Sequence, residues 1–358
     1  MDTASEKLLD ASIRHHVFLQ RYSTATARKI VALLNKADED LVAKIQKYDP
    51  TAVTGEFSRK RLEKMLEAIR AINRDAYAQV KGTLNAELKD FAAYEAGFQA
   101  RMIENAVPIA LDIVQPSAAQ LYAAVNARPF QGRLLKEYFS GLEAAVQARL
   151  RDAIRLGFVE GETIDQMVRR VRGTRANRFK DGILETNRRG AEAVVRTAVN
   201  HTATVARNEV YKANESVIKG VRWVATLDSR TTLICASRDG KVYPVDSGPR
   251  PPAHWNCRST TTPVLKSWKE MGINLREAPE GTRASLDGQV PASTTYGEWL
   301  RKQPKSVQED VLGVTKAKLY RDGKLPIDRF VDRKGEELTL AELARKESDA
   351  FQRAGVEL

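Results

Sequence analysis

Apolar residues recur at three- and four-residue steps over roughly the first 200 residues, a period that predicts amphipathic helices. The first stripe covers residues 4–48, and Asp49-Pro50 predicts its end because the residue before a proline avoids the helical conformation. A second stripe covers residues 58–108 and predicts one long helix, or two with a break near Gly82. Together the stripes predict an antiparallel helical pair that packs against the rest of the chain or against a partner.

Four shorter helical patterns follow this pair. They cover residues 118–125, 132–157, 163–171 and 187–218. Gly157 is expected to cap the end of the second of these helices, and Thr163 the start of the third.

Three of the four histidines lie in these helical segments. His15 and His16 are adjacent and point in different directions on a helix, so we predict surface residues rather than a metal site. His201 shares its helix with many polar residues and small apolar ones. That mixture predicts an internal hydrogen-bonding face, on which His201 is a structural rather than a catalytic histidine.

The stretch from Trp223 to Pro263 is the one long segment without a helical pattern. Val221–Thr226 and Lys241–Val245 alternate and contain β-formers, and Asp239-Gly240 is a turn signal before the second strand. A stiff, proline-rich loop precedes a third predicted strand, Thr260–Leu265. The sequence therefore predicts a mainly α fold with a small β-hairpin or sheet, of the α+β class, in which Cys235 returns to His254 and Cys257.

Composition is that of a soluble globular protein, with 42% hydrophobic and 29% charged residues among 358. This length allows two or three domains. No apolar run approaches the ~20 residues that cross a bilayer, so no membrane partner is expected. The acidic and polar start MDTASEKLLD does not resemble a signal peptide. Two cysteines favour folding in a reducing compartment over a disulfide framework.

The net charge of +12 points to polyanionic partners, a class in which nucleic acid comes first and acidic membrane surfaces second. Of these two we expect nucleic acid and no membrane partner. Arginine suits phosphate because its planar guanidinium pairs with two oxygen atoms at once. The most basic segment supplies the candidate nucleic-acid contacts, which are Arg169, Arg170, Arg172, Arg175, Arg178, Lys180, Arg188 and Arg189. The alternatives are a solvated charged face or pairing with acidic residues of a neighbouring subunit.

Cys235, His254 and Cys257 allow three interpretations. Thiolate and imidazole are the ligands that zinc prefers, but a closed structural site needs four of them. Cys257 and His254 also resemble a nucleophile and its base, without a third residue to orient the histidine. The third interpretation is that both thiols pack as small apolar groups in a tight hairpin.

A string of short motifs makes this part of the chain recognisable. After a helix with A-R-N-E come W-V-A-T-L-D-S-R-T, I-C-A, D-G-K-V-Y-P, G-P-R-P-P-A-H and N-C-R-S, in that order. Over about Val168–Leu265 this string resembles the head-morphogenesis family of tailed bacteriophages, typified by the F protein of phage Mu and the minor head protein of phage SPP1.

The resemblance implies a non-enzymatic minor capsid protein in the virion, in the head interior or at the portal vertex. Such a protein is assembled in the bacterial host cytoplasm, is present in several copies and aids head assembly, genome packaging or DNA delivery. The portal protein is its implied partner, with the major capsid or scaffolding protein and phage double-stranded DNA as further candidates. A virion-carried hydrolase or toxin that uses Cys257 and His254, or a free DNA-binding protein, is the alternative.

Family members often carry C-x-x-C near the first motif and H-x-x-C-x-C near the last, a pattern that suggests a metal knuckle. Here Thr232 and Ser259 stand at two of these cysteine positions. We therefore expect no cofactor, with structural zinc at Cys235, His254 and Cys257 as the alternative. The three residues are instead expected to pack and hydrogen-bond the hairpin, with Asp228 and Arg230 as internal partners.

The resemblance and the patterns together predict four consecutive parts. These are an N-terminal helical arm (1–108), a head-morphogenesis domain (109–265, core signature 187–265), a linker (266–293) and a small C-terminal domain (294–358). In the last part Thr339 is expected to cap a final helix. Its predicted miniature core consists of Tyr296, Trp299, Leu300, Leu312 and Phe330.

Overall fold

A computed structural model describes residues 3–47, 56–107, 109–274 and 281–357. Within these ranges most of the chain is helical and the strands are few and short, so the predicted class, mainly α with a small β element, is confirmed. The predicted helix stop at Asp49-Pro50 and the boundary at Pro108 lie outside the described residues. None of the helices within the described ranges is long and apolar enough to span a bilayer.

The chain divides into two compact units, each built from separate chain segments. The first unit comprises Met1–Leu19, Ala93–Ser117 and Ala203–Leu358. The second comprises Gln20–Ala92 and Ala118–Thr202. The predicted division into four consecutive parts follows chain order, whereas these units interleave distant segments.

The two long stripes form α1 (Thr3–Gln46) and α2 (Glu56–Ala106), and α2 continues through Gly82 without a break. Gly82 is exposed, and a methyl group there would meet nothing within 4 Å. Within the second unit, Tyr22 stacks on Phe91 with 4.7 Å between ring centroids, and Leu41 shares a core with Leu62. Early α1 therefore meets late α2, and late α1 meets early α2, which confirms the antiparallel pair.

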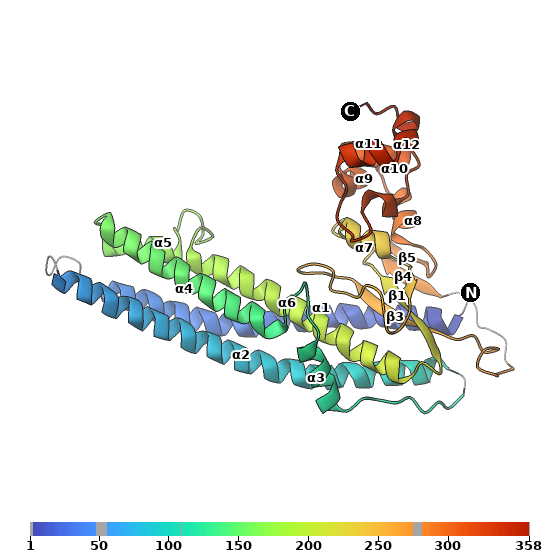
Figure 1. Ribbon diagram of the computed structural model, residues 1–358, viewed down its shortest axis with the longest axis horizontal. Helices are drawn as coiled ribbons and strands as arrows, with labels where there is room; N and C mark the ends of the chain where they lie inside the picture. The colour runs from blue at the N-terminus through green and yellow to red at the C-terminus, as the bar shows by residue number, and fades with distance from the viewer. Residues whose placement is uncertain (1–2, 48–55, 108, 275–280, 358) are drawn as a thin grey trace. The chain divides into compact units, whose positions relative to one another are not determined.

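The second unit is a helical bundle that also contains α3 (Ala118–Ala127), α4 (Leu135–Val159), α5 (Ile164–Arg172) and part of α6 (Ile183–Ala213) (Figure 1). The side chains at its centre are aliphatic. They come from all its long helices and include Leu41, Ile45, Leu66, Ile69, Leu150, Ile154 and Leu184.

Thr163 caps α5 as predicted, because its side chain accepts from the Gln166 amide in a capping box. The prediction that Gly157 caps α4 is wrong, since α4 continues to Val159 and Glu160 is its C-cap. A β-carbon at Gly157 would lie 2.9 Å from Met167 Cγ. This glycine lets α5 approach α4 closely and does not end the helix.

The prediction that His15 and His16 are surface residues is also wrong. They are 6% and 8% exposed. His15 stacks on Phe98 with 3.6 Å between ring centroids and contacts Glu95 at 2.6 Å. Helical periodicity identified one apolar face of α1. Within the first unit other segments also pack against a second face of this part of α1, and that packing buries the histidines.

The first unit contains a three-stranded antiparallel sheet in the order β2-β1-β3. The strands are β1 (Ile218–Val224), β2 (Val242–Tyr243) and β3 (Thr260–Leu265), the last as predicted. The predicted helix 187–218 ends five residues early, at Ala213, because Ile218 already pairs with Leu265 in the sheet.

A short helix, α7 (Leu233–Arg238), lies between β1 and β2, so these strands do not form the simple hairpin that the sequence suggested. The turn at Asp239-Gly240 is present, with Gly240 at φ 78°, but it joins α7 to β2. Six residues are too few to reveal a helical period.

The passage predicted as a linker contains a second hairpin, β4 (Thr282–Ser285) and β5 (Gly288–Pro291). The helices after it are α8 (Tyr296–Arg301), α9 (Lys305–Leu312), α10 (Val314–Arg321), η1 (Ile327–Phe330), α11 (Leu340–Lys346) and α12 (Ser348–Ala354). Thr339 caps α11 as predicted.

All five residues of the predicted miniature core are buried in one cluster. That cluster is larger than predicted, because Leu227, Leu233 and Ala236 of the central stretch belong to it. The C-terminal helices therefore share a hydrophobic core with α7.

Candidate functional site

The two cysteines and His254 come together beside the three-stranded sheet. Cys235 lies on α7, whereas His254 and Cys257 lie on the loop that leads into β3. Cys235 and Cys257 are buried against Trp223 and Ala225. The predicted return of Cys235 to His254 and Cys257 is thus observed.

Short polar contacts connect the cluster. Cys235 Sγ lies 3.3 Å from His254 Nε2 and 3.7 Å from Cys257 Sγ. His254 Nδ1 lies 2.8 Å from the carbonyl oxygen of Trp255. Because a carbonyl oxygen can only accept a hydrogen bond, Nδ1 carries the proton. A neutral His254 therefore presents its Nε2 lone pair to Cys235 and to the hydroxyl of Thr232, 2.9 Å away.

Proximity separates the acidities of the two thiols. The contact with Cys235, and then with His254, holds the pKa of the Cys257 thiol well below its usual range. The neighbouring Cys257 and burial raise the pKa of the Cys235 thiol. The Cys257 sulfur also raises the pKa of His254. Cys257 is consequently the thiol that ionises first.

These residues fit zinc as a set of three ligands. Their ligand atoms all lie within 4.8 Å of one another. The Nδ1 contact of His254 with a carbonyl is the outer-shell arrangement that orients metal-binding histidines. Beside this cluster lie Ser259 and Thr232, and the hydroxyl of Thr232 is 2.9 Å from His254 Nε2. These are the two positions at which the family resemblance implies cysteine, and hydroxyls are not among the usual zinc ligands.

The same geometry lacks two features of a nucleophile pair. Cys257 is only 4% exposed. The Nδ1 of His254 faces a backbone carbonyl, whereas a catalytic histidine is usually oriented by a carboxylate or amide side chain.

Asp228 and Arg230 were expected as internal partners in this region, and the structure confirms this for Asp228 but not for the side chain of Arg230. Arg258 donates to the Asp228 carboxylate from its two terminal nitrogens, Nη1 at 2.5 Å and Nη2 at 2.8 Å. Arg230 contributes only its backbone amide, 3.0 Å from the carboxylate, and its side chain is exposed.

The eight basic candidates all lie in the second unit, from α5 through the following loop to early α6. Three of them are ion-paired. Arg170 binds Glu160 and Glu162, Arg188 binds Asp38 and Glu185, and Arg189 binds Glu185. The others, Arg169, Arg172, Arg175, Arg178 and Lys180, are exposed and form no ion pair with any residue that the structure describes.

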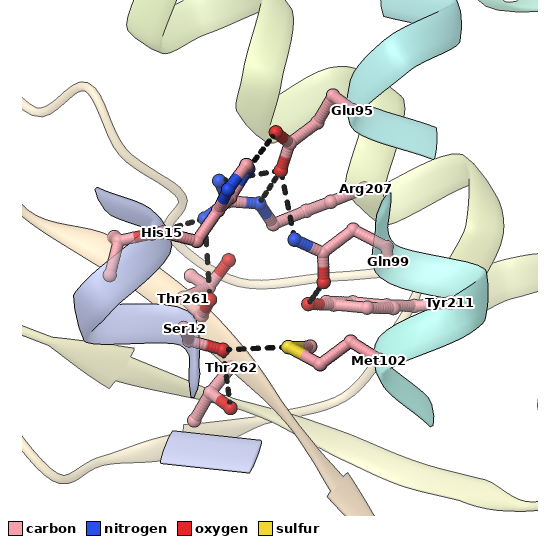
Figure 2. A network of polar contacts seen from close by, with 10 residues as sticks. Ser12, His15, Glu95, Gln99, Met102, Arg207, Tyr211, Thr261 and Thr262 are labelled. Atoms are coloured by element: carbon pink, nitrogen blue, oxygen red, sulfur yellow. Dashed lines mark hydrogen bonds and ion pairs between the residues drawn. The ribbon is translucent and has the colours of Figure 1, made fainter. Parts of the chain in front are cut away.

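A buried polar network in the first unit was missed by the sequence analysis (Figure 2). Arg207 of α6 is 2% exposed and donates to Glu95 of α2 at 2.9 Å and to the Thr261 carbonyl at 3.3 Å. His15 contacts the other oxygen of Glu95. A signal did exist, because Arg207 stands in the apolar stripe that Ala203 and Val210 define.

A second buried ion pair joins Asp239 to Arg283, at 3.0 Å, and both residues are buried. Asp239 also accepts from the backbone amides of Ala225 and Tyr296, each at 2.7 Å. One carboxylate thereby connects the end of β1, the β4 strand and the start of α8.

His201, predicted to be structural, is buried in the second unit. Burial lowers the pKa of its imidazole, which favours the neutral form.

Residues 148–262 match the family described as Phage Mu protein F like protein. This segment contains all eight basic candidates and the Cys235, His254 and Cys257 cluster. Searches of curated proteins and of solved structures found no match. Residues 148–262 are therefore a Phage Mu F-like segment, and the predicted resemblance to the phage head-morphogenesis family is confirmed.

Proposed function

We propose that the chain is a non-enzymatic minor head protein of a tailed bacteriophage. The observation that carries this proposal is the family match over residues 148–262, which covers the whole motif string. In this proposal the protein belongs to the virion, is assembled in the host cytoplasm and is present in several copies. It associates with the portal vertex and aids head assembly, genome packaging or DNA delivery.

The contacts of the motif residues support a structural role. Arg258 of N-C-R-S binds Asp228 of L-D-S-R-T. Arg250 of G-P-R-P-P donates to Asn208 of A-R-N-E at 3.0 Å. Asp239 of D-G-K-V-Y-P binds Arg283. These three charged motif residues thus bind other motifs or another segment of the same unit, as expected of a signature that specifies a fold.

The Cys235, His254 and Cys257 cluster is proposed to stabilise the sheet without a cofactor. Thr232 and Ser259 have hydroxyls where a fuller site would have thiolates, and the Thr232 hydroxyl hydrogen-bonds with His254. Zinc analysis of the purified protein should find far less than one ion per chain. One zinc per chain, removed by a chelator with loss of stability, would establish the zinc alternative instead.

The hydrolase alternative is tested by Cys257→Ala, with Cys235→Ala as the matched control. Each change removes a buried sulfur, so we expect a loss of about 1 to 2 kcal/mol of unfolding free energy. Particle yield and infectivity should stay normal for both variants. Loss of infectivity confined to Cys257→Ala, with normal incorporation into particles, would favour catalysis.

Two partners are proposed. One is the portal protein, through which such a protein would be recruited, with the major capsid or scaffolding protein as a further candidate. The other is packaged double-stranded DNA, contacted by the basic candidates of the second unit. Net charge supports the second partner, because residues 169–189 contain eight basic and two acidic residues, half of the chain's +12.

The proposal is tested in purified particles. Quantitative mass spectrometry and cryo-electron microscopy of virions and procapsids should find several copies per particle, retained after nuclease and high-salt washing. The protein should also co-purify with the portal protein from cells that lack the major capsid protein. Absence from both particle types overturns the proposal, and protein that is released with the DNA indicates a free DNA-binding protein.

A further inference from the structure

The loop between α5 and α6, residues 173–182, has a defined backbone conformation. Its two ends lie in close contact at Gly173 and Gly182. A β-carbon on Gly182 would lie 2.3 Å from the Arg172 carbonyl carbon and 2.5 Å from the Gly173 nitrogen. Gly173 has φ 97°, and a β-carbon there would lie 2.8 Å from the Phe179 carbonyl oxygen. Only glycine, which has no β-carbon, allows the two ends of the loop to approach this closely.

Asp181 holds the inside of the loop. Its carboxylate accepts from the Thr174 amide at 2.8 Å, from the Thr174 hydroxyl at 2.7 Å and from the Asn177 side chain at 2.9 Å. These donors lower the pKa of Asp181 to about 2, with Asn177 as the largest contribution. Backbone hydrogen bonds from Phe179 to Thr174 and from Lys180 to Asn177 complete the fold of the loop.

Two residues that are not glycine adopt left-handed backbone conformations at the tip. Arg178 has φ 51° and Phe179 has φ 60°. Such conformations are unfavourable for residues with a side chain and persist only where surrounding contacts fix them. The guanidinium of Arg172 lies over the Phe179 ring, 4.9 Å from its centroid, and contributes to fixing it.

This ordered loop carries cations that nothing nearby neutralises. Arg175, Arg178 and Lys180 are exposed, and none pairs with an acidic residue within the described ranges. The one acid in the loop, Asp181, is already occupied by Thr174 and Asn177. The charge is therefore available to an external anion.

We propose that the loop of residues 173–182, together with Arg172 at the end of α5, forms a preformed binding site for the phosphate backbone of double-stranded DNA. The inference rests on the proposed function, and it narrows the eight basic candidates to four exposed cations. These are Arg172 at the end of α5 and Arg175, Arg178 and Lys180 of the loop. Arg170, Arg188 and Arg189 then serve the packing of the bundle, through their ion pairs. Arg169 is exposed on α5 and lies outside the loop.

The composition of the loop favours DNA over an acidic protein surface. Protein interfaces are usually centred on apolar or aromatic anchors. Here Phe179, the one aromatic residue of the loop, lies under Arg172. Backbone phosphate recognition needs charge and hydrogen-bond donors without apolar burial.

The first test compares two triple variants of the full chain with equal charge loss. One is Arg175→Gln, Arg178→Gln and Lys180→Gln in the loop. The matched control is Lys136→Gln, Arg149→Gln and Arg155→Gln, which are exposed residues of α4 in the same unit. Binding to a random duplex of about 30 base pairs is measured by fluorescence anisotropy across a salt series.

The logarithm of the binding constant falls linearly with the logarithm of the salt concentration. Because the loop variant loses three phosphate contacts, the slope of this line should be shallower by about 2.7. Between about 50 and about 200 mM salt, wild-type affinity should thus fall roughly 40-fold more than that of the loop variant. The α4 variant should behave like the wild type. If both triple variants lost the same affinity for DNA, the binding would depend only on the net positive charge of the chain, which would overturn the loop proposal.

The second test separates loop order from charge. Asp181→Ala keeps every cation and makes the chain more positive, so plain attraction predicts equal or tighter binding. A preformed loop predicts weaker binding, by about 3- to 10-fold, because the cations of a loosened loop must lose conformational freedom on binding. Asp152→Ala on α4 makes the same charge change as a control. Tighter binding by Asp181→Ala would overturn the proposal.

Circular dichroism and thermal unfolding confirm that each variant is folded before binding is interpreted. The particle assay keeps the two proposals apart. A loop variant that enters virions but binds DNA weakly supports both proposals, whereas a wild-type protein that binds DNA but is absent from particles overturns only the head-protein proposal. Loss of portal co-purification with unchanged DNA binding would assign the loop to an acidic protein partner.

Discussion

His16 shows how burial turns one side chain into a pH-dependent contribution to stability. It is 8% exposed, and burial, followed by the nearby Arg207 charge, lowers the pKa of its imidazole to about 4. A base whose folded pKa lies below its unfolded value binds fewer protons when folded. Its neutral form therefore stabilises the fold fully above the unfolded pKa of 6.5, and this stability is lost as pH falls towards 4.

Acid should accordingly destabilise the wild type more than a variant in which His16 cannot ionise. A pKa difference of this size corresponds to about 3 kcal/mol of unfolding free energy between pH 7 and pH 4. His16→Gln should unfold with a smaller loss over that range, measured by urea denaturation at several pH values. Identical pH profiles for the two proteins would contradict the assignment.

The buried Glu95–Arg207 pair makes a different prediction, because both partners lose their hydration. Arg207 and His15 lower the pKa of Glu95 to about 2 despite the opposing effect of burial, so the carboxylate is charged at neutral pH. Glu95→Gln should cost about 3 to 5 kcal/mol, since it leaves a buried guanidinium without its counter-charge.

A double-mutant cycle tests this interpretation. Combining Glu95→Gln with Arg207→Met removes both charges, and the double variant should be less destabilised than the sum of the two single variants. Strict additivity in chemical denaturation would mean that the two groups do not stabilise each other (Figure 2).

Two helix glycines make a matched prediction at the scale of the element. Gly82 of α2 and Gly157 of α4 both lie inside helices, where alanine is intrinsically more stable by about 1 kcal/mol. Gly82→Ala should gain roughly that amount because its surroundings are open. Gly157→Ala should lose about 1 kcal/mol or more, because its methyl group would lie 2.6 Å from Glu162 Oε2 and 2.9 Å from Met167 Cγ.

Thermal unfolding of the two variants side by side measures the difference. If both variants gained the same stability, α5 would have moved away from α4 to make room for the methyl group at position 157. The contrast explains why the helical pattern located both glycines within helices or at their ends but assigned Gly157 the wrong role, since its close contact is with the next helix.

At the scale of the whole molecule, the C-terminal helices and the central stretch depend on one core. Leu227, Leu233 and Ala236 pack with Tyr296, Trp299 and Phe330. A chain that ends at residue 293 would expose these apolar side chains to water. We expect it to aggregate or to bind a hydrophobic dye strongly, compared with the full chain in the same buffer.

Gel filtration and dye fluorescence measure this outcome. A soluble, monomeric chain 1–293 with the thermal midpoint of the full chain would contradict it. Such a result would support the predicted C-terminal domain, 294–358, as an independent part.

Much of the fold follows from the sequence because its signals are local. The helical period located α1 and α2, and the capping threonines at 163 and 339 marked helix starts, since each depends on residues only a few positions apart. The motif string likewise identified the Phage Mu F-like segment without any structure.

What the tertiary structure decided depends on residues that are far apart in the chain. The burial of His15 and His16, the Glu95–Arg207 pair across 112 positions and the role of Gly157 follow from which surfaces meet, and a period along one element does not encode that. The charge of the loop after α5 was visible in the sequence. Which of its arginines remain unpaired was decided only by folding, because an ion pair forms where packing brings opposite charges together.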